Sequence, residues 1–144
     1  MQTASVPLPP LVIVRPWPDP IVEAIGFGPQ SSYIECCWLP VMGPTATWLY
    51  RRLGSLVFQS TDDTLVDLID TAQSLGLGRG LSHQSMIGRA LGRLDHFNAV
   101  RWTECGQLAV RRALPPLTPR QLAQASDFAC TMHRQLVTGE PTAA

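Results

Sequence analysis

Residues 67–112 constrain the fold of this chain most, because two helical patterns are followed there by an alternating one. Asp67 is a favourable N-cap, and Asp70 places a second carboxylate in the first turn, where the helix dipole favours negative charge. Gly76 suits the left-handed position that follows a helix C-terminus. Apolar residues recur between these positions at helical spacing: Leu68, Ala72 and Leu75. The segment therefore predicts a first helix that ends before Gly76.

A second helix is predicted over residues 82–97, after the glycine-rich connection GLGRGL. Ser82 is the expected N-cap, and Asn98 can take the left-handed conformation that stops a helix. The inward face carries Ile87, Leu91 and Leu94, and the opposite face carries Ser85, Arg89, Gly92 and His96, with Arg93 beside them. Gly88 and Gly92 each cost about 1 kcal/mol relative to alanine. Close approach of DNA or of a neighbouring helix would explain them.

Residues 100–112 alternate as a β-hairpin does, around a turn at residues 103–106. Val100 and Trp102 share one face of the first strand with Leu108 and Val110 of the second, and Arg101, Ala109 and Arg111 point the other way.

This order, preceded by a short strand at residues 64–66, resembles the winged helix-turn-helix superfamily over residues 44–112. The resemblance is to bacterial proteins. It implies a mainly α fold with a small β-hairpin wing, and helical extensions at both ends. In that superfamily the second helix enters the DNA major groove and the wing contacts the backbone.

The N-terminal part divides into two predicted regions. Residues 1–18 are proline-rich and are expected to form an extended arm. Its apolar run at residues 11–14 packs on its own domain, pairs as an edge strand or lies on a partner. Residues 19–42 are predicted to form a helical extension: one short helix begins at Asp19 and closes at Gly26, and another begins at Ser32 and ends before Pro40.

The winged-helix core is placed at residues 43–113. Its first helix begins at Pro44 and carries an apolar stripe, with Arg51 and Arg52 expected in solvent off that stripe. The stripe contains Ala46, Leu49, Leu53 and Leu56.

Residues 114–138 are predicted to contain a C-terminal helix opened by a capping box at Thr118 and Gln121. That helix either folds back on the domain or pairs with a second copy, and the N-terminal arm offers another route to a homodimer. A disordered tail is expected over residues 139–144.

Charge is distributed unevenly although the formal net charge is zero. Residues 1–70 hold three arginines and seven acidic residues, whereas residues 79–120 hold seven arginines and two acidic residues. The basic block coincides with the predicted second helix and wing, where it could face a polyanion.

The expected DNA contacts follow from this placement. Base contacts are assigned to Gln84, Ser85, Arg89 and Arg93, since arginine can bind guanine with two hydrogen bonds. Backbone contacts are assigned to Arg79, Ser82, His83, His96, Arg101, Arg111 and Arg112.

The sequence gives little support for metal binding, catalysis or membrane insertion. Cys130 and His133 have half of a zinc-site spacing without a complementary pair, so no metal and no cofactor is expected. No nucleophile motif or phosphate loop after a strand is present, which argues against an enzyme. No apolar run approaches the roughly 20 residues of a membrane span. A cytoplasmic chain with buried free thiols, and with Cys105 the most exposed, is expected.

The leading hypothesis is double-stranded DNA binding in transcription or replication control, by a recognition helix at residues 82–97 and a wing at 100–112. The alternative is a winged-helix subunit that assembles with a protein partner and does not bind DNA. Its support is the zero net charge and the apolar N-terminal arm.

Overall fold

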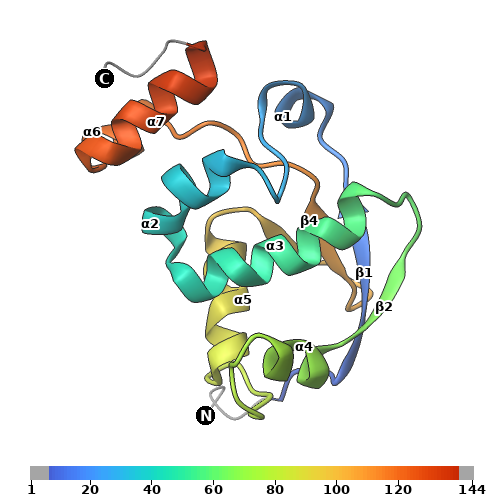
Figure 1. Ribbon diagram of the computed structural model, residues 1–144. Coiled ribbons are helices and arrows are strands. Elements are labelled where there is room, and N and C mark those ends of the chain that lie inside the picture. Colours follow the sequence, from blue (N-terminus) through green and yellow to red (C-terminus); the bar gives the residue numbers. More distant parts are fainter. Residues whose placement is uncertain (1–6, 140–144) are drawn as a thin grey trace.

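The computed structural model describes residues 7–139, in which helices pack against a four-stranded mixed sheet in an α/β fold (Figure 1). The elements are, in chain order, β1 (Leu11–Trp17), α1 (Pro20–Ile25), the π-helical segment η1 (Ile34–Trp38), α2 (Leu39–Met42), α3 (Pro44–Phe58), β2 (Thr64–Asp67), α4 (Leu68–Ser74), α5 (Met86–His96), β3 (Val100–Trp102), β4 (Leu108–Arg111), α6 (Pro119–Ala123) and α7 (Asp127–Thr138). The sheet is therefore larger than the hairpin that the sequence predicts. No helix among residues 7–139 is long and apolar enough to cross a membrane.

The sheet has the strand order β2-β1-β4-β3. β3 and β4 form the predicted antiparallel hairpin, and the turn at residues 103–106 places Gly106 at a φ of 79°. β1 lies between β2 and β4, antiparallel to the first and parallel to the second. The sheet thus joins a segment near the N-terminus to a hairpin almost a hundred residues later.

The extended arm predicted over residues 1–18 is wrong where the structure describes it. Residues 11–17 form an interior strand, in which Val12 and Val14 are buried while Leu11 and Ile13 are exposed. Pro16 lies beyond Val14, the last residue of β1 that pairs with β2. This side of β1 is therefore an unpaired strand edge at Pro16, and an unpaired edge tolerates proline. Residues 1–6 lie outside the described part of the chain.

The helix predicted from Ser32 to Pro40 continues further than expected. After a widened turn, in which the Leu39 amide donates to the Ile34 carbonyl, it runs through Pro40 to Met42. The π-helical turn shifts the hydrogen-bond register, and Pro40 falls in the first turn of α2, where no helical partner for its missing N–H is needed. The preceding short helix is confirmed: α1 is capped by Asp19 and ends at Gly26.

α3 begins at Pro44 as predicted and packs on α5, β1 and β4 (Figure 1). Ala46, Leu49 and Leu53 of the predicted stripe are buried, and Leu56 is half-buried. The expectation that Arg51 is solvated is wrong, because only 12% of its side chain is exposed and its Nη2 donates to the Ser31 carbonyl. Residues 28–35 fold over this side of α3. Arg52 is exposed, as predicted.

α4 begins after Asp67, whose carboxylate accepts the Asp70 amide, and Gly76 follows its end at a φ of 73°. α5 begins later than predicted, because Ser85 and not Ser82 is its N-cap. Residues 82–85 instead form a turn in which the Ser85 amide and hydroxyl both donate to the Ser82 carbonyl. The helix predicted over residues 82–97 thus spans Met86–His96. It ends before Asn98, which has the expected positive φ of 59°.

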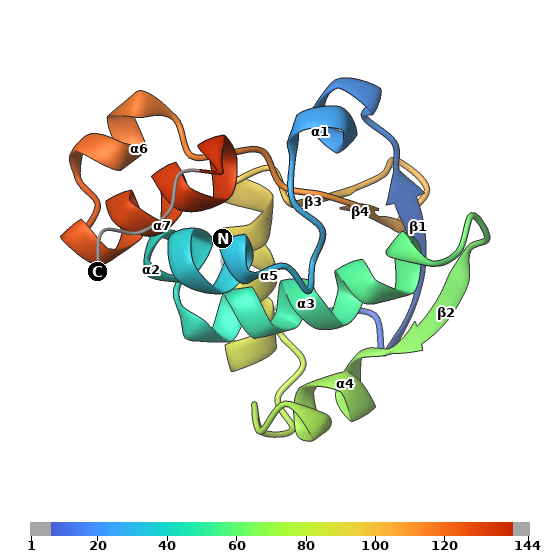
Figure 2. The same cartoon turned by 45° about the horizontal axis from the view of Figure 1, so that its top comes forward.

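The C-terminal region contains two helices where the sequence predicts one. The capping box at Thr118 and Gln121 is formed, but Ser126 caps a new helix by accepting the Ala129 amide. Figures 1 and 2 show α6 and α7 on the side of the molecule away from β2. Gly139 ends α7 in the left-handed conformation, and residues 140–144 of the predicted tail lie outside the described part.

α7 is held against η1 by hydrogen bonds around a buried tyrosine. The Tyr33 hydroxyl lies 2.7 Å from His133 Nδ1 and accepts the Leu117 amide at 2.8 Å. The Cys37 thiol donates to the Ala129 carbonyl at 3.7 Å. Ala129 is fully buried in this contact. The C-terminal helix α7 therefore packs against the domain through its inner face.

Candidate nucleic-acid interface

The predicted division of α5 into an inward and an outward face is confirmed. Four residues of its apolar face are buried: Ile87, Ala90, Leu91 and Leu94. The outward face exposes Met86, Arg89, Gly92, Arg93 and His96. The sequence folds this way because α5 packs on α3 and β3 through one side only, which leaves the other side for solvent or a ligand.

Arg89 and Arg93 lie one turn apart on this face but have different partners. Arg93 Nε donates to the Met42 carbonyl at 2.7 Å, and its Nη2 lies 3.4 Å from the Val41 carbonyl. These carbonyls belong to the last turn of α2, where a cation is favoured because the carbonyls lack helical partners. The Arg89 side chain is exposed and has no hydrogen-bond or ion-pair partner within residues 7–139. Of the two predicted base-reading arginines, only Arg89 is unengaged.

Two grooves border Arg89. One, of about 350 Å³, runs between the first half of α5 and the start of α3, and both arginines line it. The other, of about 520 Å³, follows the second half of α5 past Gly92 and His96. Arg89 and Arg93 line both grooves.

The two glycines of α5 have different surroundings. A Cβ added at Gly88 would clash with the Ser82 carbonyl oxygen and lie 2.8 Å from His83 Cα, so the turn before the helix requires this glycine. A Cβ added at Gly92 would meet no atom within 4 Å. Packing within the described chain therefore explains Gly88 and leaves Gly92 as an unexplained glycine on an open helix face.

The turn before α5 changes the roles predicted for its serines. Ser85 was expected to contact a base, but its hydroxyl donates to the Ser82 carbonyl and accepts the Gly88 amide as the helix cap. Ser82 is half-buried, and its hydroxyl accepts the Gln84 amide. Gln84 and His83 are exposed but lie outside the helix, as does the exposed Arg79. The predicted recognition residues at this end therefore belong to a loop.

Two arginines assigned to the DNA backbone are bound within the protein. Arg111 Nη1 lies 2.7 Å from an Asp19 carboxylate oxygen, and its Nε donates to the Asn98 carbonyl at 2.6 Å. The hydrogen bond from Arg111 lowers the pKa of Asp19 below its ordinary value. Only 14% of the Arg111 side chain is exposed, so in this structure its guanidinium is bound within the protein and not presented to a DNA backbone.

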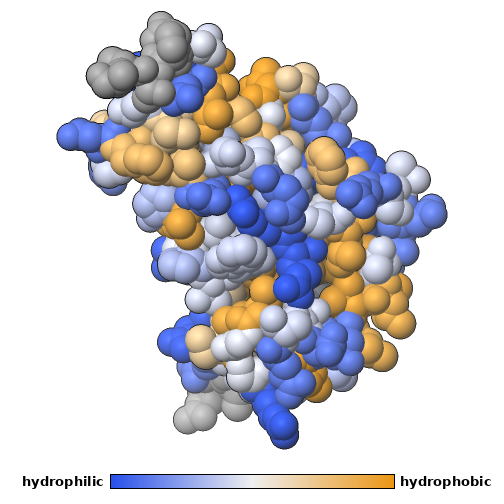
Figure 3. All heavy atoms as spheres, in the orientation of Figure 1, coloured by the Kyte–Doolittle hydropathy of each residue, from blue (hydrophilic) through white to orange (hydrophobic). Residues whose placement is uncertain are grey.

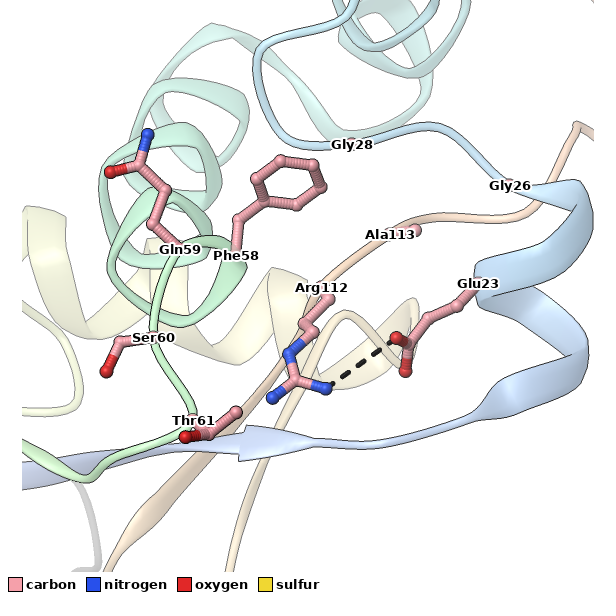
Figure 4. A pocket seen from close by; sticks show the side chains of 9 residues that line it. All are labelled: Glu23, Gly26, Gly28, Phe58, Gln59, Ser60, Thr61, Arg112 and Ala113. Atoms are coloured by element: carbon pink, nitrogen blue, oxygen red, sulfur yellow. Dashed lines mark ion pairs between the residues drawn. The ribbon is translucent and has the colours of Figure 1, made fainter.

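Arg112 is likewise occupied, as Figure 4 shows. Its Nε donates to the Val57 carbonyl at 3.1 Å, and its Nη1 lies 3.7 Å from Glu23 Oε1. Both side chains line a cavity of about 520 Å³ that Phe58 and the 59–61 loop complete. Arg112 therefore joins the end of α3 to α1, and it is not an unengaged phosphate contact.

Arg101 remains exposed on β3, with its guanidinium carbon 4.2 Å from the centre of the Trp17 ring. The guanidinium of Arg111 lies 3.9 Å from the same ring. Sequence reasoning missed Trp17 and Arg15, which reaches Gln107 Oε1 at 3.2 Å. The alternation of residues 11–17 was a signal that Arg15 and Trp17 share one face of a strand.

The predicted contact residues that are exposed and are not bound to the carbonyls of α2 form a smaller set than the sequence implies: Arg79, His83, Gln84, Arg89, His96 and Arg101. No group of three or more histidine, cysteine or acidic residues within residues 7–139 is arranged to hold a metal ion. Comparison of the chain with protein-family models, with curated proteins and with solved structures found no match.

Proposed function

We propose that this protein binds double-stranded DNA through the outward face of α5, as a winged helix-turn-helix regulator of transcription or replication. The order of α3, β2, α4, α5 and the β3–β4 hairpin supports this interpretation, because it is the order of elements in that superfamily. The additional strand β1 lies between β2 and the wing strand β4. It widens the sheet and leaves the outward face of α5 uncovered.

The observation that carries the proposal is the pairing of Arg89 with Gly92 on one exposed helix face. The Arg89 side chain is a cation without a partner in the described part of the chain, and Gly92 removes the side chain that would keep a bulky ligand away from the helix backbone. A helix that lies in the major groove needs both features: a long donor to reach base edges and space for close approach.

Electrostatic attraction should contribute only modestly to the affinity for DNA. The exposed arginines Arg79, Arg89 and Arg101 can neutralise about three phosphates, so the logarithm of affinity should fall with the logarithm of salt concentration at a slope of about −3. A single copy should therefore bind weakly at physiological salt.

Fluorescence anisotropy with a mixed-sequence duplex across a salt series tests this proposal. Arg89→Ala should weaken binding by about fivefold or more and reduce the salt slope by about one. Arg120→Ala is the matched control, since it removes an exposed arginine from α6 and should change neither quantity. A wild-type protein whose signal does not change with salt, or equal losses in the two variants, would contradict the proposal.

A second candidate function is assembly with a protein partner without DNA binding. The specific observation in its favour is that Arg93, Arg111 and Arg112 all bind partners within the chain. The basic block is then largely a structural device that holds α2, α1 and the hairpin in place. The same salt series separates the two functions, because a flat response favours assembly.

A further inference from the structure

The cavity of about 520 Å³ between α1, the end of α3 and the 59–61 loop is separate from the proposed DNA-binding face, since none of its lining residues belongs to α5. Its volume falls within the roughly 300–1,000 Å³ that is usual for sites that bind small molecules. Figure 3 shows apolar and hydrophilic atoms next to one another over α1 and the end of α3. The cavity can therefore hold a small organic ligand that has both polar and apolar parts.

Two opposite charges lie together in this cavity, as Figure 4 shows. Arg112 Nη1 is 3.7 Å from Glu23 Oε1, which is longer than a hydrogen bond. Other atoms of the two side chains hold them in place: Arg112 Nε donates to the Val57 carbonyl, and Glu23 Oε2 accepts the Asp19 amide at 2.9 Å. Within residues 7–139, Arg112 Nη2 and Glu23 Oε1 form no hydrogen bond. Both charged groups thus keep hydrogen-bonding capacity for a ligand.

Phe58 supplies an apolar wall beside this ion pair. Its ring is 57% exposed and lies against Gly28, where an added Cβ would be 3.0 Å from the ring. A second cavity, of about 360 Å³, shares Gly28, Phe58 and Gln59 with the first, so the ring lies at the junction of the two. An exposed phenylalanine ring in this position gains burial when an aromatic group packs on it.

We propose that this cavity binds a free α-amino acid that has an aromatic side chain. The ammonium and carboxylate groups of such a molecule are adjacent, so they can lie antiparallel on the ion pair, the ammonium on Glu23 and the carboxylate on Arg112. The pair does not have to separate, and the aromatic side chain lies against Phe58. A ligand with a single charge would be repelled by the like charge of the pair, which disfavours simple carboxylates and amines. Amino-acid binding here does not depend on DNA binding.

Titration of the ¹⁵N-labelled protein with L-phenylalanine, followed by two-dimensional NMR of the amide groups, tests this site. The roughly 12 non-hydrogen atoms of the ligand give an expected dissociation constant of about 1 mM. Amide signals from residues 23–28, 58–61 and 112–113 should shift. Three related probes each lack one recognised group: 3-phenylpropionate the ammonium, 2-phenylethylamine the carboxylate and glycine the ring. Each should bind about fivefold more weakly or worse.

Glu23→Gln separates recognition of the ligand from a structural role of Glu23. The glutamine carbonyl oxygen can still accept the Asp19 amide, but the negative charge is gone. Affinity for L-phenylalanine should fall about fivefold, whereas affinity for 3-phenylpropionate should rise about threefold because the repulsion is removed. Glu104→Gln changes an exposed carboxylate in the β3–β4 turn and should alter neither affinity. A change of both affinities in the same direction would contradict the assignment.

Phe58→Ala tests the apolar wall, and Phe128→Ala, at an exposed phenylalanine on α7, is its control. The first should weaken L-phenylalanine binding about fivefold and leave glycine unaffected, and the second should change neither. The ligand series on the wild type remains decisive if a variant fails to fold. No shifts at about 20 mM L-phenylalanine, equal affinities for the four probes, or shifts centred away from the cavity would overturn the proposal.

Discussion

Gly88→Ala is expected to lower the free energy of unfolding by about 1–3 kcal/mol, because the added methyl group overpacks against backbone that cannot move independently. The clash is with the Ser82 carbonyl oxygen, in the turn whose hydrogen bonds position the Ser85 cap. Alanine has a better helix propensity than glycine, which by itself would raise the free energy of unfolding. A net loss would therefore mean that the clash outweighs this gain. Urea unfolding followed by circular dichroism gives the value.

Gly92→Ala is the matched control in the same helix. Its methyl group would meet no atom within 4 Å, and alanine should therefore raise the free energy of unfolding by about 0.5–1 kcal/mol. Opposite signs for the two variants would establish that one glycine is structural and the other is not. Two stabilising or two destabilising changes would contradict the placement of the 82–85 turn.

Raising the pH from 8 to 12 is expected to remove several kcal/mol of stability, which is the second large effect. Burial raises the pKa of the Cys37 thiol from 9.0 to about 11 and that of the Tyr33 hydroxyl from 10.0 to about 12. Burial also raises the pKa of Tyr50. In each case the folded state keeps a proton that the unfolded state has released, so stability is complete below pH 9 and falls as the pH rises.

The expected size is about 2–3 kcal/mol each for Cys37 and Tyr33. Urea midpoints at pH 8, 9.5 and 11 should fall steadily, and tyrosinate absorbance should appear only as the protein unfolds, because both tyrosines of the chain are buried. Cys37→Ala should be less stable at pH 8 but lose less stability up to pH 11. Tyrosinate absorbance in the folded protein near pH 10 would show that Tyr33 and Tyr50 are accessible to solvent.

Local rules predicted the helices and the hairpin well, because their signals are contained in a few adjacent residues. Asp67 caps α4, Pro44 begins α3 and Asn98 ends the segment after α5, each as its side-chain chemistry requires. The misplaced start of α5 shows the limit of such rules. Ser82 and Ser85 are both good caps, and the turn that Ser85 caps brings the Ser82 carbonyl oxygen where only a glycine at position 88 leaves room for it.

Features that depend on distant residues could not be predicted. β1 is an interior strand because β2 and β4 reach it from positions 64–67 and 108–111, and its prolines indicated an arm instead. The helical wheel placed Arg93 on the correct face but could not show that the α2 carbonyls lie opposite it. The pairing of Arg111 with Asp19 spans 92 residues of sequence. The predicted candidate site therefore included arginines whose side chains are bound within the protein.

The most direct test of the central claim, that the outward face of α5 contacts DNA, is the affinity of Gly92→Leu for the duplex that the wild type binds. A Cβ at Gly92 would meet no atom within 4 Å, and leucine is a better helix former than glycine, so the variant should be at least as stable as the wild type. We predict DNA binding weakened by about tenfold or more, equivalent to about 1.4 kcal/mol, because the side chain would hold the helix away from the groove. Equal affinity in the two proteins would contradict the claim and place any bound DNA on another surface.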